Sequence, residues 1–274
     1  MDNQPQFARL ASRAVIAVSG PDWRSFLQGL ITQDVETLKR EEIRFAALLA
    51  PQGRVLFDLF VIGIDGGCLI DCAADQRDAL IQRLGMYRLR AKVEITPSDL
   101  TVMGLWQAAT SPTGWNADPR LPGLGYRGYG APAPAGALEA DEIAYEAHRL
   151  GLGVPGSADW GSDAAYAVEA NFDLLNGIDF KKGCFVGQET TSRMKRRGVV
   201  KSRMAPIAFS GPAPEKGAEL LAGTLRAGQS LCGADGAAIA LLRLDRLAAG
   251  PLTLADGRPW RLVCPAWLST GIEA

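Results

Sequence analysis

Cys184 is the side chain of this sequence whose neighbours point most clearly to chemistry. Gly183 and Gly187 bracket it, which indicates backbone with positive φ or the close approach of another group. Residues 188–197 lack helix breakers and predict a helix, so Cys184 falls just before a helix N-terminus, with the lysine pair 181–182 beside it. Oriented amides and nearby cations favour a thiolate. The residues are compatible with a reactive thiol and equally with a small buried side chain at a tight turn.

Two carboxylates stand in apolar surroundings. Asp58 lies inside an apolar run, and a buried charge needs compensation. We expect its partner to be a ligand amine or pterin edge, or an internal arginine such as Arg88 or Arg90. Glu169 has small and apolar neighbours and could accept two parallel hydrogen bonds from an N–C–NH₂ edge. The alternative for Glu169 is an ordinary acid on the surface of a helix.

Six cations are crowded into eleven positions. Such a run indicates either a solvated face or a patch for polyanions, such as the polyglutamate tail of folate or RNA. They are Arg193, Lys195, Arg196, Arg197, Lys201 and Arg203.

A metal site made by this chain alone is not expected. The sequence has no Cys-x-x-Cys pair, His148 is its only histidine, and Cys68 and Cys72 would lie about 13 Å apart on a strand. That single histidine also argues against a thiol hydrolase.

Strand and helix patterns alternate in the first part of the chain. Strands are predicted at 14–19, 43–49, 55–64, 68–72, 91–96 and 100–107, and helices at 22–29, 75–87 and 141–150. Pro51-Gln52-Gly53 predicts a hairpin turn between two of these strands. Residues 110–137, rich in Pro and Gly, predict a long loop with at most one short strand. Beyond residue 199, short apolar runs predict a small all-β unit, so we expect an α+β fold.

The composition is that of an ordinary globular protein. The 274 residues are 47% hydrophobic, and 29 Lys and Arg balance 30 Asp and Glu, so a global electrostatic footprint for nucleic acid is absent. The first residues show neither a signal-peptide nor a transit-peptide pattern. No stretch has the length of a membrane span. The odd number of scattered cysteines favours reduced thiols, and we expect a cytoplasmic protein without a membrane partner.

The run Lys182 to Glu189 resembles a family signature. It matches the pattern Lys-Gly-Cys-Phe/Tyr-x-Gly-Gln-Glu of the folate-binding YgfZ-type proteins, which are relatives of the glycine-cleavage T-protein, an aminomethyltransferase. Supporting blocks lie at residues 26–35, 48–54, 169–173, 177–180 and 193–198. The similarity covers most of the chain, and is less clear over residues 110–137 and the last ~70 residues.

The resemblance implies an aminomethyltransferase-like fold, with antiparallel sheets and helices around a central folate channel and a C-terminal β-barrel. We therefore expect parts at 1–108, 109–198 and 199–274. It implies that tetrahydrofolate or a derivative is the cofactor and that Cys184 is the indispensable thiol. Glu169 would hold the pterin edge, and Asp58 would lie near the folate carbon. The folate-binding residues expected on this basis are Glu169, Asp58, Arg193, Lys182 and Gln188.

The resemblance also implies a function: assembly or repair of iron–sulfur clusters, particularly [4Fe–4S] clusters. The expected partners are folate, iron–sulfur assembly proteins and client enzymes, among them enzymes that modify tRNA. Two alternatives are a tetrahydrofolate-dependent one-carbon transferase and an RNA-associated module using the basic run. The aminomethyltransferases have an asparagine where this chain has Asp71 or Cys72, which argues against aminomethyl transfer.

Overall fold

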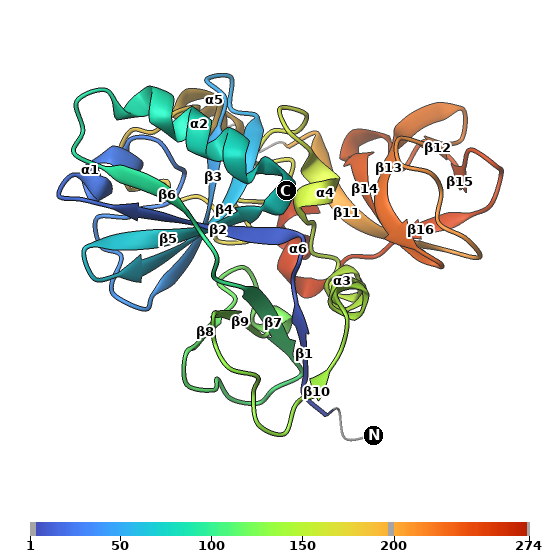
Figure 1. Cartoon of the computed structure of the whole chain (residues 1–274). Helices are drawn as coiled ribbons and strands as arrows, with labels where there is room; N and C mark the ends of the chain where they lie inside the picture. Colours follow the sequence, from blue (N-terminus) through green and yellow to red (C-terminus); the bar gives the residue numbers. More distant parts are fainter. Residues whose placement is uncertain (1–3, 197–199, 273–274) are drawn as a thin grey trace.

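Three β-sheets carry the fold of the computed structural model, which describes residues 4–196 and 200–272 (Figure 1). All neighbouring strands run antiparallel except one short parallel pair. Helices lie against the first sheet and between the sheets. The predicted α+β class with antiparallel sheets and a C-terminal barrel is therefore confirmed.

The first sheet contains five strands in the order β3-β4-β5-β2-β6. Their bounds are β3 (Ile43–Leu49), β4 (Val55–Ile64), β5 (Gly67–Ala73), β2 (Arg13–Ser19) and β6 (Glu94–Ser98). Two helices, α1 (Trp23–Gln28) and α2 (Arg77–Arg88), pack on one face of it, and the short 3-10 turn η1 (Ala74–Gln76) precedes α2. The predicted hairpin is present, and Gly53 in its turn has φ +86°.

Both faces of this sheet are buried, which explains why its central strands are apolar almost without interruption. In β3, Ala46 and Leu48 join the core beneath α1 and α2, whereas Phe45, Ala47 and Leu49 join a second core on the opposite face. Successive side chains of a strand point to opposite faces, so a single strand serves both cores.

The second sheet has the order β10-β1-β7-β9-β8. Its strands are β10 (Leu138–Glu139), β1 (Gln6–Arg9), β7 (Val102–Trp106), β9 (Tyr126–Tyr129) and β8 (Trp115–Ala117), with the 3-10 turn η2 (Pro122–Leu124) between β8 and β9. The expectation of at most one strand in residues 110–137 is wrong, because β8 and β9 pair with each other and β9 pairs with β7. Glycines with positive φ at 114, 125 and 130 make the turns around these strands.

Three helices follow the second sheet: α3 (Glu142–Gly151), α4 (Ser157–Trp160) and α5 (Gln188–Arg196). Asp141 caps α3, since its side chain accepts a hydrogen bond from the Ala144 amide at 2.8 Å. In Figure 1, α3 and α4 lie where the three sheets meet.

The third sheet is the predicted C-terminal barrel, with the order β15-β12-β13-β14-β11-β16. The strands are β11 (Ser202–Phe209), β12 (Glu219–Ala222), β13 (Leu225–Ala234), β14 (Ala237–Arg243), β15 (Leu252–Leu254) and β16 (Trp260–Leu262). The 3-10 turn η3 (Leu244–Arg246) and helix α6 (Ala266–Ile272) complete it. A bridge between Thr253 and Pro259 joins the two edge strands, so the barrel is nearly closed. The three-part division at residues 108 and 198 stays a prediction.

Candidate functional site

Cys184 is exposed, and it is carried by a loop that is fixed on both sides. The next two side chains enter different cores: Phe185 packs in the core between the first sheet and residues 154–185, and Val186 packs beneath α1 and α2. Gly183 and Gly187 have φ +94° and +81°, which confirms that both positions need the left-handed region. The sulfur is thus displayed to solvent by a loop with one buried anchor, Phe185, and one half-buried anchor, Val186.

Lys182 ties this loop to the C-terminal end of α1 and to the segment that follows it. Its Nζ donates to the backbone carbonyls of Gln28, Ile31 and Gln33 at 2.7, 2.6 and 2.8 Å. An ammonium has three donors, so all of them are used. Burial lowers the pKa of Lys182 to about 8, while the nearby Asp34 carboxylate opposes this shift. Its position supports a structural role in holding Cys184.

The β3–β4 turn supports the other end of the loop. A Cβ placed on Gly187 would lie 2.7 Å from the Ala50 carbonyl oxygen and 3.1 Å from the Gly53 Cα. A Cβ placed on Gly53 would lie 3.1 Å from the Thr190 Cβ of α5. Only glycines allow this close packing, so the two glycine-containing turns and α5 form one unit.

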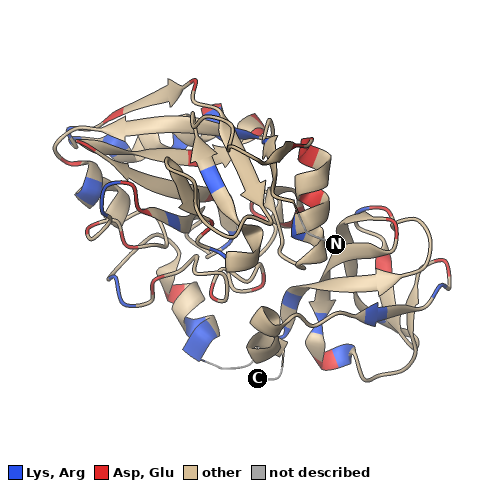
Figure 2. Cartoon of the chain, turned by 90° about the horizontal axis from the view of Figure 1, so that it is seen from below, with Lys and Arg blue, Asp and Glu red and all other residues tan. Residues whose placement is uncertain are grey.

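Helix α5 begins at Gln188, as predicted, and its C-terminal half is cationic. The blue Lys and Arg positions at the end of this helix are visible in Figure 2. Arg193, Lys195 and Arg196 are exposed, and none of them has an ion-pair partner among the described residues. Gln188 is half-buried at the first turn. Arg197 lies outside the described residues.

Arg203 does not belong to a surface patch, contrary to one interpretation of the basic run. Its guanidinium is buried, pairs with Asp173 at 2.9 Å and donates to the carbonyls of Val168 and Gly271. The remaining cation of the run, Lys201, is exposed. The exposed charge is therefore concentrated on α5.

Glu169 is half-buried and lies near the start of the barrel. Its backbone carbonyl accepts from the Met204 amide at 2.8 Å, and its side chain accepts from the Tyr166 amide at 3.2 Å. Burial raises the pKa of Glu169, although the Tyr166 amide and the charge of Arg54 lower it. Glu169 is thus not an ordinary acid on the surface of a helix. Its hydrogen bond and the nearby positive charge do not fully offset the effect of burial on its carboxyl group.

Asp58 is buried, and its partner is an internal arginine, but not one of the two suggested by the sequence. Arg13 Nη1 lies 2.7 Å from Asp58 Oδ2, and the Ser157 hydroxyl donates to Asp58 Oδ1 at 2.7 Å. Arg88 and Arg90 are exposed. Burial alone would raise the pKa of Asp58, but the Arg13 charge and the Ser157 hydrogen bond bring it below its ordinary value.

A buried network of charges extends from Asp58. Arg13 also pairs with Asp71 at 2.6 Å, and Asp71 pairs with Arg127 at 2.7 Å. Arg127 shares Asp118 with Arg120, at 3.1 and 2.7 Å. The network contains three arginines (Arg13, Arg120, Arg127) and three aspartates (Asp58, Asp71, Asp118), so their formal charges cancel.

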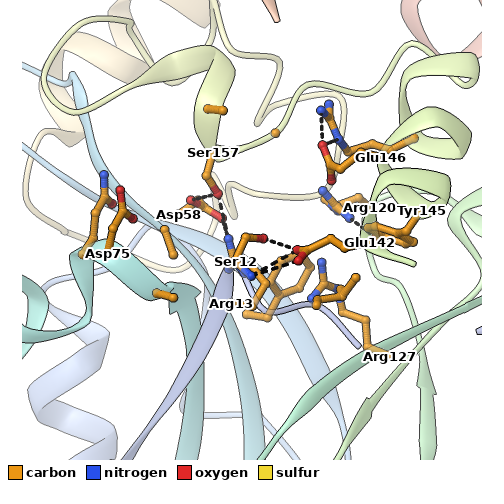
Figure 3. Close-up of a pocket in the computed structure, with 18 residues that line it drawn as sticks. Ser12, Arg13, Asp58, Asp75, Arg120, Arg127, Glu142, Tyr145, Glu146 and Ser157 are labelled. Atoms are coloured by element: carbon orange, nitrogen blue, oxygen red, sulfur yellow. Dashed lines mark hydrogen bonds and ion pairs between the residues drawn. The ribbon is translucent and has the colours of Figure 1, made fainter. Parts of the chain in front are cut away.

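This network forms one wall of a cavity of about 480 Å³ (Figure 3). The size is in the range of small-molecule sites. Residues from β2, β4, α3 and α4 converge on it, including Arg13, Asp58, Tyr145 and Ser157. Arg13, Arg120 and Arg127 were not found by sequence reasoning. The only signal was that arginines interrupt apolar or Pro- and Gly-rich segments.

The cavity and the thiol are formed by different parts of the chain. Of the residues expected to bind folate, Asp58 lines the cavity, whereas Glu169, Lys182, Gln188 and Arg193 are not among its lining residues in the described part of the chain, and neither is Cys184. A packed aromatic group occupies the core beside β3 and β4, with ring centroids 4.7 Å apart for Phe45 and Phe172 and 5.1 Å for Trp160 and Phe172. Of the five expected residues, Asp58 alone therefore lines this cavity in the described part of the chain, and folate binding by these residues stays a prediction.

Two further properties concern the described ranges 4–196 and 200–272. No group of three His, Cys, Asp or Glu side chains there is arranged to hold a metal ion. None of the helices there combines the length and apolar character of a bilayer-spanning segment.

Comparison with known proteins gives a consistent assignment. The profile of a family described as "CAF17, C-terminal beta-barrel domain" matches residues 201–270. The crystal structure of glycine cleavage system aminomethyltransferase T from Bartonella henselae superposes with a TM-score of 0.76 over 97% of this chain and 87% of that one. At 13% sequence identity this similarity shows the fold alone.

The curated relatives are iron–sulfur cluster assembly factors named IBA57. The mouse protein is 32% identical over 97% of this chain and 86% of its own length. The human protein is 30% identical over 89% of this chain and 79% of its own length. The Neurospora crassa homologue is 34% identical over 78% of this chain. The matched region spans 56% of the length of the fungal protein.

These relatives are mitochondrial proteins. The comparison therefore contradicts the cytoplasmic location expected from the sequence. With an aminomethyltransferase-like fold, a CAF17-type barrel and identities of this extent, the chain belongs to the family of IBA57 iron–sulfur cluster assembly factors.

Proposed function

We propose that this chain assists the assembly or repair of iron–sulfur clusters, particularly [4Fe–4S] clusters, with Cys184 as a transient ligand. The observation that carries the proposal is an exposed thiol on a loop whose neighbours are anchored in two cores. Thiolates are the usual ligands of such clusters. A fixed loop lowers the entropic cost of presenting the sulfur to an incoming cluster.

One thiol is not enough to hold a cluster. Within the described residues Cys184 does not belong to any group of three His, Cys, Asp or Glu side chains that could hold a metal ion. A cluster bound to Cys184 would need its remaining ligands from another molecule. We therefore propose that this chain works in a complex with an iron–sulfur assembly protein or a client enzyme, and that the cluster is cargo and not a resident cofactor.

Complementation of a cluster-assembly defect tests the proposal. Cys184→Ala should fail to restore the activity of a [4Fe–4S] enzyme, whereas wild type should restore it. Cys264→Ala is a matched control, because Cys264 is also a free, exposed thiol. Equal rescue by Cys184→Ala and wild type would falsify the proposal.

Binding of tetrahydrofolate, and an indirect role for tRNA-modifying enzymes, stay predictions. Calorimetric titration with tetrahydrofolate tests the first. If Glu169 holds the pterin edge, Glu169→Ala should weaken binding, and an unchanged affinity would remove Glu169 from the site. The transferase alternative predicts turnover of an amine donor with tetrahydrofolate that survives Cys184→Ser, so this variant separates the two functions.

The RNA-associated alternative has one observation in its favour, the exposed cations of α5. It predicts binding that weakens steeply as salt rises and that does not need Cys184. A filter-binding assay at two salt concentrations, with wild type and Cys184→Ala, distinguishes it from cluster assembly.

A further inference from the structure

Two arginines in the cavity wall have donors that the described protein does not use. Arg120 donates from Nε and Nη2 to Asp118, and its Nη2 also donates to the Tyr145 hydroxyl. Arg127 donates from Nε to Asp118 and from Nη1 to Asp71. No hydrogen bond reaches Arg120 Nη1 or Arg127 Nη2 from the described residues. Both side chains are about 95% buried or more, with 5% and 3% of their residue surface exposed.

These donors are not fully enclosed by packed protein. The buried polar atoms without a partner in the described ranges are Ser230 Oγ and Trp260 Nε1, so the two arginine nitrogens remain accessible. Arg120 and Arg127 both line the cavity. In Figure 3 their side chains extend toward it from the wall that carries Tyr145. The accessible surface of these nitrogens is therefore assigned to the cavity.

The two guanidinium groups are held in place before any ligand arrives. Asp118 bridges them, and both lie over the ring of Phe60, at 3.7 Å from its centroid for Arg127 and 4.9 Å for Arg120. The charge of a guanidinium is retained throughout the physiological pH range. Two such groups on one support form a preorganised pair of charged donors.

Three of the four carboxylates that line the cavity are already engaged by the protein, and the fourth, Asp75, is exposed. Asp58 accepts from Arg13 and Ser157, and Glu146 accepts from Arg149 at 2.6 Å. Glu142 accepts from the backbone amides of residues 11 and 12. Among the buried polar groups of the wall, those with unused donors are consequently Arg120 and Arg127, which suit an acceptor on the ligand.

We infer that the cavity binds a small organic carboxylate through Arg120 Nη1 and Arg127 Nη2. Guanidinium groups recognise carboxylates with strong, directional hydrogen bonds. A cavity of 480 Å³ is much larger than a bare inorganic anion, and Leu10, Phe60 and Ala158 supply apolar wall for an organic body. This site goes beyond the proposed function and does not depend on Cys184.

Ligand fragments test the inference on the wild-type protein. 4-Aminobenzoyl-glutamate carries the carboxylates of folate without the pterin, glutarate is a free dicarboxylate, and tetrahydrobiopterin is a pterin without a carboxylate. Calorimetry should show binding of at least one carboxylate probe and none of tetrahydrobiopterin. Binding of 4-aminobenzoyl-glutamate alone assigns the site to a folate-like tail, and binding of glutarate assigns it to free dicarboxylates.

Variants place the binding in this cavity. Arg127→Lys keeps the charge but loses the planar fork, and it should weaken binding roughly 10- to 100-fold. Because Arg127 is buried, folding of this variant is checked by thermal unfolding. Ala158 is exposed at the cavity wall, so Ala158→Phe should block binding without touching the arginines, whereas Ala158→Ser should not. Failure of both carboxylates to bind wild type at millimolar concentration, or equal binding by Ala158→Phe, overturns the inference.

Discussion

At the scale of single residues, the five cysteines differ in accessibility. Cys184 and Cys264 are exposed, Cys232 is half-buried, and Cys68 and Cys72 are buried in β5. Burial raises the pKa of Cys68 and of Cys72 to about 12. An alkylating reagent attacks the thiolate, so it should label the two exposed thiols and leave Cys68 and Cys72 unmodified until the chain unfolds.

Mass spectrometry after brief alkylation of the native protein checks this prediction. Labelling of Cys68 or Cys72 at the rate of Cys184 under native conditions would contradict the burial described for β5. Unfolding in denaturant supplies the positive control, because all five thiols should then react.

Asp71 is the residue on which the buried network depends most. It pairs with both Arg13 and Arg127, and it is completely buried. Asp71→Asn leaves two buried cations without full compensation, so we expect a loss of about 3–5 kcal/mol in the free energy of unfolding. Denaturant titration measures it, with Asp256→Asn as control. Asp256 pairs with Arg258 near the surface, and its loss should change stability little.

Acid should destabilise the protein partly through Asp118. Burial by itself raises its pKa, but Arg120 and Arg127 lower the pKa of Asp118 from 3.8 to about 2. A carboxyl with a depressed pKa in the folded state contributes stability above its unfolded value, and this contribution is lost as the pH falls from about 4 to about 2. Thermal unfolding over this range should show the loss. In Asp118→Asn this part of the pH dependence should be absent.

At the scale of the elements, Gly183 and Gly187 form a matched pair. Both have positive φ, but a Cβ at Gly187 would lie 2.7 Å from the Ala50 carbonyl oxygen, whereas a Cβ at Gly183 meets nothing within 4 Å. Gly187→Ala should therefore separate the Cys184 loop from the β3–β4 turn, at a cost of about 1–3 kcal/mol. Gly183→Ala should cost less.

Complementation combined with thermal unfolding checks this difference. We expect Gly187→Ala to impair rescue although Cys184 is intact, because the loop no longer holds the sulfur in place. Full rescue by Gly187→Ala together with an unchanged melting temperature would show that the close packing is unimportant.

At the scale of the whole molecule, the local features were predictable and the cavity was not. The β3–β4 hairpin, the glycines around Cys184 and helix α5 each follow from short-range residue chemistry. The strands β8 and β9 were missed because their Pro- and Gly-rich segment gains its structure by pairing with β7. The buried arginines pair with aspartates distant in sequence, as Arg13 does with Asp58 and Asp71, and no spacing pattern signals such contacts.

The strand arrangement of the second sheet also depends on pairing between residues distant in sequence. Strand β1, at residues 6–9, joins β7 and β10 in the second sheet, although it precedes the entire first sheet in the chain. A non-local pairing of this kind depends on the complete fold.

The charges of Lys181, Lys182 and α5 were visible in the sequence, yet the structure shows that Lys182 binds backbone carbonyls.

Protection of Cys184 from alkylation is the most direct measurement of the central claim. The protein is mixed with an assembly protein that carries an iron–sulfur cluster, and separately with its cluster-free form, before brief alkylation. Cys184 should be protected only by the cluster-bearing partner, while Cys264 reacts equally in both mixtures. Alkylation of Cys184 at the same rate with and without the cluster would contradict its role as a cluster ligand.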